Sequence, residues 1–304
     1  MNLFSLAKAF PTEEDALAHW VKTRWPEGVR CLGCGHDRCY QIETKGKTGK
    51  VARLFECADC KLHFSATTGT LFHDSHLPLQ KWFMAIALMV EAKKGVSAKQ
   101  MQRHLGCAYK TAWYLCHRIR QAMQESETQT LGGTGVVVEM DETLIGGRIA
   151  GGGLKNIRGN KVYVVGIAER GGKVHMQTIS RVNAETLKQV LDKKVSPATP
   201  KIVTDGAHAY KTIVPSEKHQ IGNHDKEKRA GRKLSNQTVE GVFSLFKRGI
   251  VGSYHQLGTE HLDRYLGEFC WRFNRRGLQP WLFGMALESV AANKPLPYKK
   301  LTEF

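Results

Sequence analysis

The order of apolar and polar residues in the C-terminal half of the chain predicts strands first and helices afterwards. Residues 135–141 form a β-branched run that ends at Asp141, which is typical of a buried strand. Two further apolar runs are separated by Gly171 and Gly172, and such a glycine pair favours a hairpin turn. We therefore predict three successive strands, over residues 135–141, 161–168 and 173–180.

A helix and a fourth strand follow, and then only helices. Asn183 can cap a helix over residues 185–191, and the short apolar run 201–204 predicts a strand. The last helices are expected near residues 207–211, 238–247 and 260–275. This order predicts an α/β domain of the ribonuclease H-like class, with a mixed five-stranded sheet and flanking helices.

Upstream of these strands, two helical segments meet at Gly106. Ser97 can cap the first, and the second has apolar residues at helical spacing. The second segment also has polar and basic residues that we expect to be exposed, namely Tyr109, Lys110, Arg118 and Arg120. A short helix, a glycine turn and a basic second helix are typical of a helix-turn-helix that binds DNA. An ordinary helical hairpin that packs on its neighbours is the alternative.

Four of the eight cysteines form two Cys-x-x-Cys pairs that are 22 residues apart. The ligands that they offer are the thiolates of Cys31, Cys34, Cys57 and Cys60. Two such pairs on tight turns supply the tetrahedral four-sulfur site that structural Zn²⁺ prefers. A redox pair or plain buried thiols are the alternative, and the paired spacing argues against both. We therefore predict a zinc ribbon.

These patterns divide the chain into three predicted regions. An N-terminal helix and the zinc ribbon occupy residues 1–72, the helix-turn-helix region covers residues 77–130, and the ribonuclease H-like domain covers residues 135–304. The glycine-rich residues 131–135 are the predicted linker between the second and third regions.

The balance of charge indicates what the chain binds. A formal net charge of +17 and a pI near 9.6 favour a polyanionic partner. The most apolar stretch, residues 82–90, is far shorter than the roughly 20 residues that a spanning helix needs, so we expect no membrane insertion. The first residues lack the layout of a secretory signal. We expect a cytoplasmic protein that associates with the nucleoid.

Three acidic residues stand in contexts that suit a two-metal site. Asp141 ends the first strand, Asp205 directly follows the fourth, and Glu240 lies in a later helix. Carboxylates so placed can converge on two Mg²⁺ ions that activate one oxygen and stabilise another in a displacement at phosphorus. Taken singly, each acid could be an ordinary turn or exposed helix residue. Glu142 is a further candidate, but strand alternation predicts that it points to the other side of the sheet.

Together these motifs resemble bacterial insertion-sequence transposases of the DDE superfamily, in the ISXO2-like group that has an N-terminal zinc ribbon. The resemblance covers the chain from the cysteines to about Arg276. It rests on residues 139–147, 204–206, 235–249, 252–255, 265–269 and 272–276.

The resemblance implies that Asp141, Asp205 and Glu240 are the catalytic triad and that they hold Mg²⁺ or Mn²⁺. It implies that Lys247, which lies two helical turns after Glu240, contacts the DNA end. Further backbone contacts are implied for Arg248, Arg272, Arg275 and Arg276. Some similar transposases are thought to use an asparagine as third ligand, and Asn236 lies one turn before Glu240. A carboxylate is the better ligand for Mg²⁺, which favours Glu240.

The implied reaction is hydrolysis at the end of an element, followed by attack of the freed 3′-hydroxyl on target DNA. The partners are then double-stranded DNA, both element ends and target, and a second copy of the chain, because joining two ends requires at least a dimer. The ribbon and the helix-turn-helix are expected to bind the terminal inverted repeats. One alternative is a DNA-binding regulator with an inert catalytic domain, and another is a ribonuclease or junction nuclease of the same fold.

Overall fold

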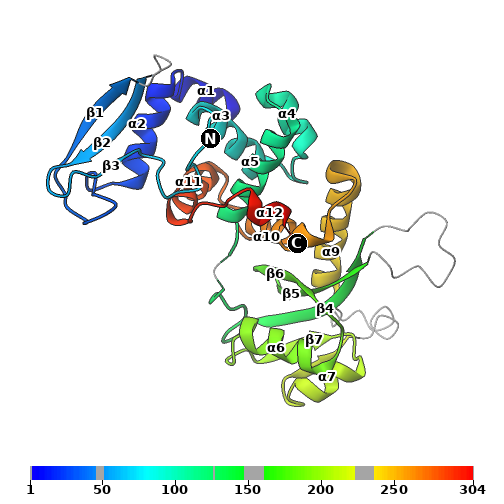
Figure 1. Cartoon of the computed structure of the whole chain (residues 1–304). Helices are drawn as coiled ribbons and strands as arrows, with labels where there is room; N and C mark the ends of the chain where they lie inside the picture. Colours follow the sequence, from blue (N-terminus) through cyan, green and yellow to red (C-terminus); the bar gives the residue numbers. More distant parts are fainter. Residues whose placement is uncertain (1, 46–50, 126, 147–160, 223–235, 304) are drawn as a thin grey trace. The chain divides into compact units, whose positions relative to one another are not determined.

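The computed structural model describes residues 2–45, 51–125, 127–146, 161–222 and 236–303 (Figure 1). They belong to two compact units. The first comprises Met1–Ala92, Ala98–Ala122 and Leu278–Phe304, and the second comprises Lys93–Ser97 and Met123–Gly277. The segment from Leu278 onward therefore packs with the N-terminal elements, whereas the sequence placed it in the third predicted region.

A small antiparallel sheet forms one part of the first unit. Its strands are β1 (Cys39–Lys45), β2 (Val51–Cys57) and β3 (His63–Phe64), in that order. The rings of Trp25, Phe55 and Phe64 pack edge to face or tilted beside the cysteines and give this sheet its own small core. Helix α2 (Glu13–Arg24) begins with a capping box between Thr12 and Asp15.

Helices make up the rest of the first unit. They are α1 (Leu3–Ala9), α3 (Leu79–Glu91), α4 (Ala98–Leu105), α5 (Tyr109–Ala122), α11 (Leu282–Ala292) and α12 (Lys299–Thr302), with a short 3₁₀ turn η4 (Gln279–Trp281). Phe83 of α3 contacts the rings of both Phe10 and Phe283. This aromatic contact explains why α11 belongs with the N-terminal helices, because Phe283 fills their core.

The second unit is built on a mixed five-stranded sheet, as the sequence predicted (Figure 1). Its strands are β4 (Val137–Ile145), β5 (Val162–Glu169), β6 (Val174–Ile179), β7 (Lys201–Thr204) and β8 (His219–Ile221), in the order β6-β5-β4-β7-β8. The β4, β5 and β6 strands are antiparallel, while β7 is parallel to β4 and β8 is parallel to β7. The fifth strand was not located in the sequence, since three residues are too few to show a period.

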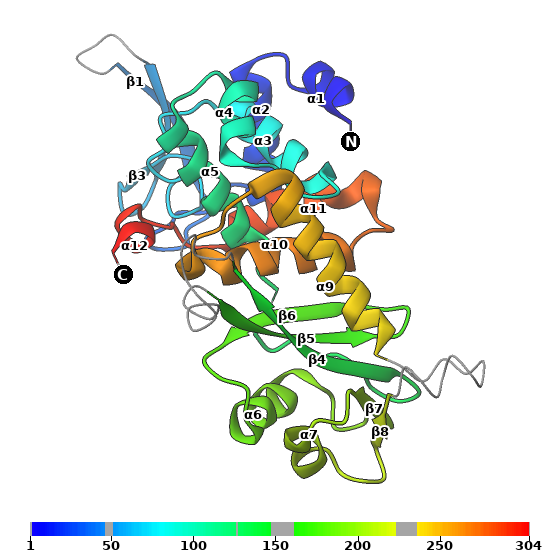
Figure 2. The same ribbon diagram turned by 90° about the vertical axis from the view of Figure 1, so that its right-hand side faces the viewer.

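Helices cover both faces of this sheet (Figure 2). Helices α6 (Ala184–Lys194) and α7 (His208–Ile213) lie on one face. The other face is covered by α9 (Gln237–Gly249), which continues into the π-helix η2 (Ile250–Tyr254), and by α10 (Leu262–Asn274), which follows the 3₁₀ turn η3 (Thr259–His261). Each face therefore has its own apolar core. Within the described residues, no helix combines the length and apolar character that crossing a bilayer requires.

Strand β4 serves both cores because its side chains alternate. Val138 and Met140 pack with α6 and α7, whereas Ile145 packs with α9. The strand runs four residues beyond its predicted end at Asp141, because residues 141–145 stay paired with β5. Asp141 therefore lies within the strand and not at its end.

Helix α9 sits close to the sheet at Gly166 of β5. A Cβ atom built on Gly166 would lie 2.6 Å from Cζ of Phe243 and 2.9 Å from Cγ2 of Val239, both on α9. A Cβ atom essentially never lies this close to a non-bonded heavy atom, so glycine is the residue that permits this approach. Because α9 carries Glu240, the same glycine helps to set the depth of a candidate site residue.

We predict that Gly166→Ala destabilises the second unit. The added methyl group meets a rigid ring, and overpacking of this kind costs about 1–3 kcal/mol. The matched control is Gly241→Ala on α9, where a Cβ meets nothing within 4 Å. The higher helix propensity of alanine should stabilise this variant by up to about 1 kcal/mol. Urea unfolding measures both variants. Equal stability of the two would contradict the close approach at Gly166.

Candidate functional site

The four predicted cysteine ligands meet in the first unit. The Sγ atoms of Cys31 and Cys60 are 3.5 Å apart, and those of Cys34 and Cys57 are 3.6 Å apart. Tetrahedral Zn–S bonds of about 2.3 Å place neighbouring sulfurs roughly 3.8 Å apart. The cluster therefore fits a structural Zn²⁺ ion. Within the described residues it is also the one set of metal-binding side chains whose ligand atoms all lie within 4.8 Å of one another.

The three predicted acids are presented by three neighbouring elements of the second unit. Asp141 lies in β4, Asp205 directly follows β7, and Glu240 lies in the first turn of α9. In the parallel pairing of β4 with β7, Glu139 stands opposite Val203. Asp141 and Asp205 each lie two residues further along, and they therefore reach the same level of the sheet.

Electrostatics link the three acids. Burial raises the pKa of Asp141 to about 7, and the negative charges of Glu142, Asp205 and Glu240 raise it further against the lowering effect of the Glu142 backbone N–H. These carboxylates repel one another because they are close. Within the described residues, their ligand atoms do not all lie within 4.8 Å of one another, as those of the four cysteines do.

An open groove of about 490 Å³ runs past two of the acids. Asp141 and Glu240 line it together with Glu142, Thr143, Phe243, Ser244, Lys247, Arg248 and Val251. Asp205 does not line it. Acidic side chains at one end and basic ones at the other give the groove both metal-binding and phosphate-binding groups.

Asn236 contacts Asp141 directly. Its side chain is buried, and its Nδ2 donates a hydrogen bond to Oδ2 of Asp141 at 3.1 Å. Glu240 lies one turn further along α9, in the groove. Both candidates for the third ligand therefore lie beside Asp141, and the amide already holds one of its oxygens.

Glu142 points to the other side of the sheet, as strand alternation predicted. Its Oε2 accepts a hydrogen bond of 2.5 Å from the hydroxyl of Tyr210, which is a buried residue of α7. Burial raises the pKa of Glu142 and also that of Tyr210. The pair ties α7 to β4.

Glu139 is a functional residue that the sequence analysis missed. Its carboxylate is 1% exposed and accepts hydrogen bonds from the backbone N–H groups of Thr238 at 2.7 Å and of Val239 at 3.1 Å. It also accepts a bond from the Thr238 hydroxyl at 2.9 Å and forms an ion pair with Arg170 at 2.7 Å. Glu139 thus caps the N-terminus of α9, where the helix dipole favours a negative charge. The signal in the sequence that could have revealed it is an acidic residue within an apolar strand, because a buried carboxylate needs a partner.

Two basic residues of α9 remain at the groove. Nζ of Lys247 donates a hydrogen bond of 2.6 Å to the hydroxyl of Thr143, and Arg248 is exposed beside it. In the first unit, Lys110 is exposed, with its ammonium group 4.5 Å from the ring centre of Tyr298. These three side chains stay accessible to a phosphate backbone.

The prediction that Arg118 and Arg120 are exposed is wrong. They are 3% and 1% exposed, because the second half of α5 is buried on all sides. The Arg118 guanidinium lies over the rings of Trp82 and Tyr114 and donates to the carbonyl oxygen of His73. Neither arginine can reach DNA from this position.

The C-terminal arginines are also engaged within the protein. Arg275 forms two hydrogen bonds to the carboxylate of Glu125, at 2.5 and 3.2 Å, and lies over the ring of Trp271. Arg272 is buried and pairs with Glu268. These contacts fix the start and end of the second unit to each other and leave little of either guanidinium for a DNA backbone.

Comparisons with known proteins point to one family. Residues 130–274 match the family model of the ISXO2-like transposase domain, and residues 11–63 match that of the transposase zinc-ribbon domain. The chain is also similar to a Halobacterium salinarum protein described as an uncharacterized protein in transposable element ISH50. The two are 27% identical over 282 residues, which cover 86% of this chain and 91% of the relative. The first match contains all three acids, and the second contains all four cysteines.

The raised pKa of Asp141 predicts a pH-dependent stability. With a folded pKa of about 7 against an ordinary 3.8, the folded state holds a proton that the unfolded state has lost, so stability falls as pH rises from about 4 to 7. Asp141→Asn removes this dependence. The unfolding free energy of the unaltered protein, relative to the variant, should fall by on the order of 1–2 kcal/mol between pH 5 and pH 8 without added divalent metal. A difference that stays constant with pH would contradict the shift.

Glu139→Gln is predicted to destabilise the second unit strongly. An amide has one acceptor oxygen for the four donors around Glu139, and it leaves Arg170 without its carboxylate. Breaking a buried pair in this way costs about 3–5 kcal/mol. Glu127→Gln is the control, since its carboxylate is 86% exposed and pairs with Lys193 at the surface, where a pair is worth about 0–1 kcal/mol. Similar urea midpoints for the two variants would rule out the capping role.

Proposed function

Because the chain belongs to the ISXO2-like insertion-sequence transposases with a zinc-ribbon domain, we propose that it is a DDE transposase that cleaves the ends of its element and joins them to target DNA. The observation that carries this proposal is the placement of three acids: Asp141 and Asp205 lie at the same level of neighbouring strands, and Glu240 lies in the first turn of α9. Burial raises the pKa of Asp141 to about 7, and the charges of Glu142, Asp205 and Glu240 add to this shift. A cluster of repelling carboxylates is costly unless it binds cations.

The fold is consistent with this activity. Three antiparallel strands, followed by two parallel ones on the other side of the first strand, form a sheet with helices on both faces. We assign it to the ribonuclease H-like class on this strand order. Helices α4 and α5, joined by a turn at Gly106, are the proposed helix-turn-helix, in which Tyr109 and Lys110 at the start of α5 are exposed to bind DNA.

The acids are proposed to hold two Mg²⁺ or Mn²⁺ ions, which supply an activated oxygen and neutralise charge at phosphorus when bound. Asp141 and Asp205 lie at the same level of neighbouring strands and can share an ion. Asp141 must release its proton as it becomes a ligand, because only the carboxylate binds. Oxygen ligands of this kind are those that Mg²⁺ prefers.

Glu240 is the proposed third ligand, and Asn236 orients Asp141. The amide of Asn236 donates to Oδ2 of Asp141, and the backbone N–H of Glu142 donates to Oδ1 at 2.9 Å. A carboxylate oxygen that accepts one hydrogen bond keeps a second lone pair, with which it can bind metal. Hydrogen bonds to ligand side chains commonly fix their orientation. Glu240 lines the groove one turn along α9 and is placed to complete the site.

The DNA strand is proposed to lie along the groove, where Lys247 and Arg248 contact its phosphates. Lys247 lies seven residues after Glu240, about 10 Å along α9, which is on the scale of one or two nucleotides. Lys110 is the proposed contact in the first unit. Joining two element ends requires at least two copies of the protein on DNA.

Asp205→Asn is predicted to abolish both cleavage and strand transfer. The assay uses a duplex with the terminal sequences that flank the gene, in Mg²⁺ or Mn²⁺. Removing a metal ligand should cost more than the roughly 10–100-fold typical of a residue that only orients one, and Asn236→Ala should fall within that smaller range. Asp192→Asn is the matched control, because Asp192 is exposed on α6 and pairs with Lys188.

Two outcomes would contradict the proposal. Normal strand transfer by a folded Asp205→Asn protein would exclude Asp205 from the site. Tight binding of the ends by the unaltered protein, without metal-dependent cleavage, would favour a DNA-binding regulator instead.

A further inference from the structure

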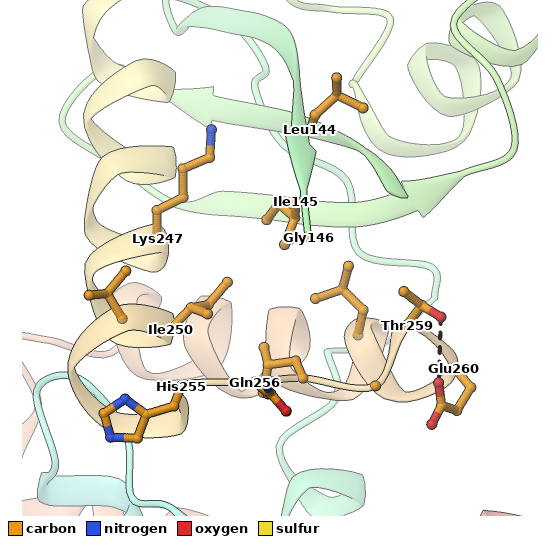
Figure 3. Close-up of a pocket in the computed structure, with 13 residues that line it drawn as sticks. Leu144, Ile145, Gly146, Lys247, Ile250, His255, Gln256, Thr259 and Glu260 are labelled. Carbon is orange, nitrogen blue, oxygen red and sulfur yellow. Dashed lines mark hydrogen bonds between the residues drawn. The ribbon is translucent and has the colours of Figure 1, made fainter. Parts of the chain in front are cut away.

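A second pocket, of about 720 Å³, lies beside the catalytic groove in the second unit (Figure 3). It is formed by the end of β4, the last turn of α9 with the π-helix η2, and the segment that leads into α10. Lys247 and Val251 line both the groove and this pocket. The groove and the pocket therefore adjoin, and a DNA strand that lay in the groove would pass the mouth of the pocket.

The backbone at the rim of this pocket is strained. His255 has φ +61° and ψ −48°, and Gln256 N–H donates to the carbonyl of Tyr254 at 2.7 Å. This is a γ-turn with positive φ, which is rare for any residue with a side chain. It directly follows a π-helix, whose last bond runs from His255 N–H to the carbonyl of Ile250. Both features are unfavourable in isolation and are found most often at functional sites.

The lining has an apolar floor and a polar rim. Ile145 and Leu262 are almost fully buried beneath it, and Ile250 and Leu257 complete the floor. Gln256, Thr259 and Glu260 stand at the rim, where the Thr259 hydroxyl donates to Glu260 at 3.5 Å (Figure 3). Lys247 enters from the side of the groove. The lining is about as polar as it is apolar, and the volume lies within the range of about 300–1,000 Å³ that is typical of small-ligand sites.

We propose that this pocket binds one unpaired nucleotide of the cleaved strand, next to the phosphate held by the carboxylates. This proposal rests on the proposed function, because it takes the groove as the path of the DNA strand. The apolar floor contacts the faces of the base, Lys247 contacts its phosphate, and the acceptor oxygens of Gln256 and Glu260 meet the donor groups on the base edge.

The geometry favours a single nucleotide over a duplex. A base inside a duplex is covered by its neighbours and its partner, so it can enter a pocket only after it leaves the stack. Leaving the stack is easiest at a frayed end, and an element end becomes one as it is cut. The end of the groove that carries Lys247 and Arg248 also favours a strand with phosphates over a neutral peptide.

The test combines a filled pocket with DNA that lacks a base. Leu257→Trp places an indole in the pocket and should slow cleavage of intact DNA by roughly tenfold or more, because the strand is displaced from the carboxylates. An abasic site at one position beside the cleavage point should restore most of the lost rate in the variant. Leu245→Trp is the matched control, since Leu245 is exposed on α9 and lines neither hollow.

Rim variants give a second measurement if Leu257→Trp does not fold. Gln256→Ala and Glu260→Ala change exposed side chains, and both should slow cleavage of intact DNA while leaving abasic DNA unaffected. With 2-aminopurine at the same position, the emission should rise when the unaltered protein binds, as the base leaves its stack.

The outcomes separate this proposal from the proposed function. If the unaltered protein cleaves but no abasic position relieves Leu257→Trp or the rim variants, the nucleotide pocket is excluded and the transposase stands. If abasic DNA rescues each variant equally at every position, the effect is a general loosening of the duplex and the pocket is again excluded. No cleavage by the unaltered protein would overturn the proposed function itself.

Discussion

The capping of the first turn of α9 by the Glu139 carboxylate is the interaction on which the rest of the second unit depends. A buried carboxylate is tolerated only if its charge is compensated, and here the compensation comes from Arg170 and from the N-terminal N–H groups of the helix. Those N–H groups have no partner within the helix. The carboxylate and the N–H groups therefore satisfy each other's need for a hydrogen-bond partner. Their bonds fix the helix that carries Asn236 and Glu240 to the strand that carries Asp141.

Side chains along β4 alternate between the two faces of the sheet, so adjacent acidic residues have different partners. Glu139 and Asp141 face α9, where Glu139 accepts hydrogen bonds from the first turn of the helix and Asp141 belongs to the proposed metal site. Glu142 accepts a hydrogen bond from Tyr210 of α7. A slip of the strand by one residue would exchange these roles and bury the wrong carboxylate in each core. Two cores, one on each face, hold the register.

The sequence predicted what depends on local pattern and spacing. Paired cysteines at ribbon spacing and acids after apolar runs are visible without a structure, and so are four of the five strands of the second unit. The burial of Arg118 was not predictable, because the helical pattern assigns it to a polar face and only packing against Trp82 reveals otherwise. The capping of α9 by Glu139 joins residues about a hundred positions apart in the sequence, and no local sequence pattern indicates it.

The far end of α9 is held as firmly as its start, which explains how a strained rim can persist there. Tyr254 at the end of the π-helix donates to buried Glu268, which also pairs with Arg272, and Arg272 donates to the carbonyl of Lys93. The segment after Lys93 comes so close that a Cβ on Gly95 would lie 1.8 Å from the Tyr254 hydroxyl. With both ends anchored, α9 and the π-helix set a fixed spacing between the acids, the lysine two turns later and the pocket beyond. In the proposed complex, a DNA strand that crosses α9 would therefore meet the acids, Lys247 and the pocket at distances that the protein backbone sets.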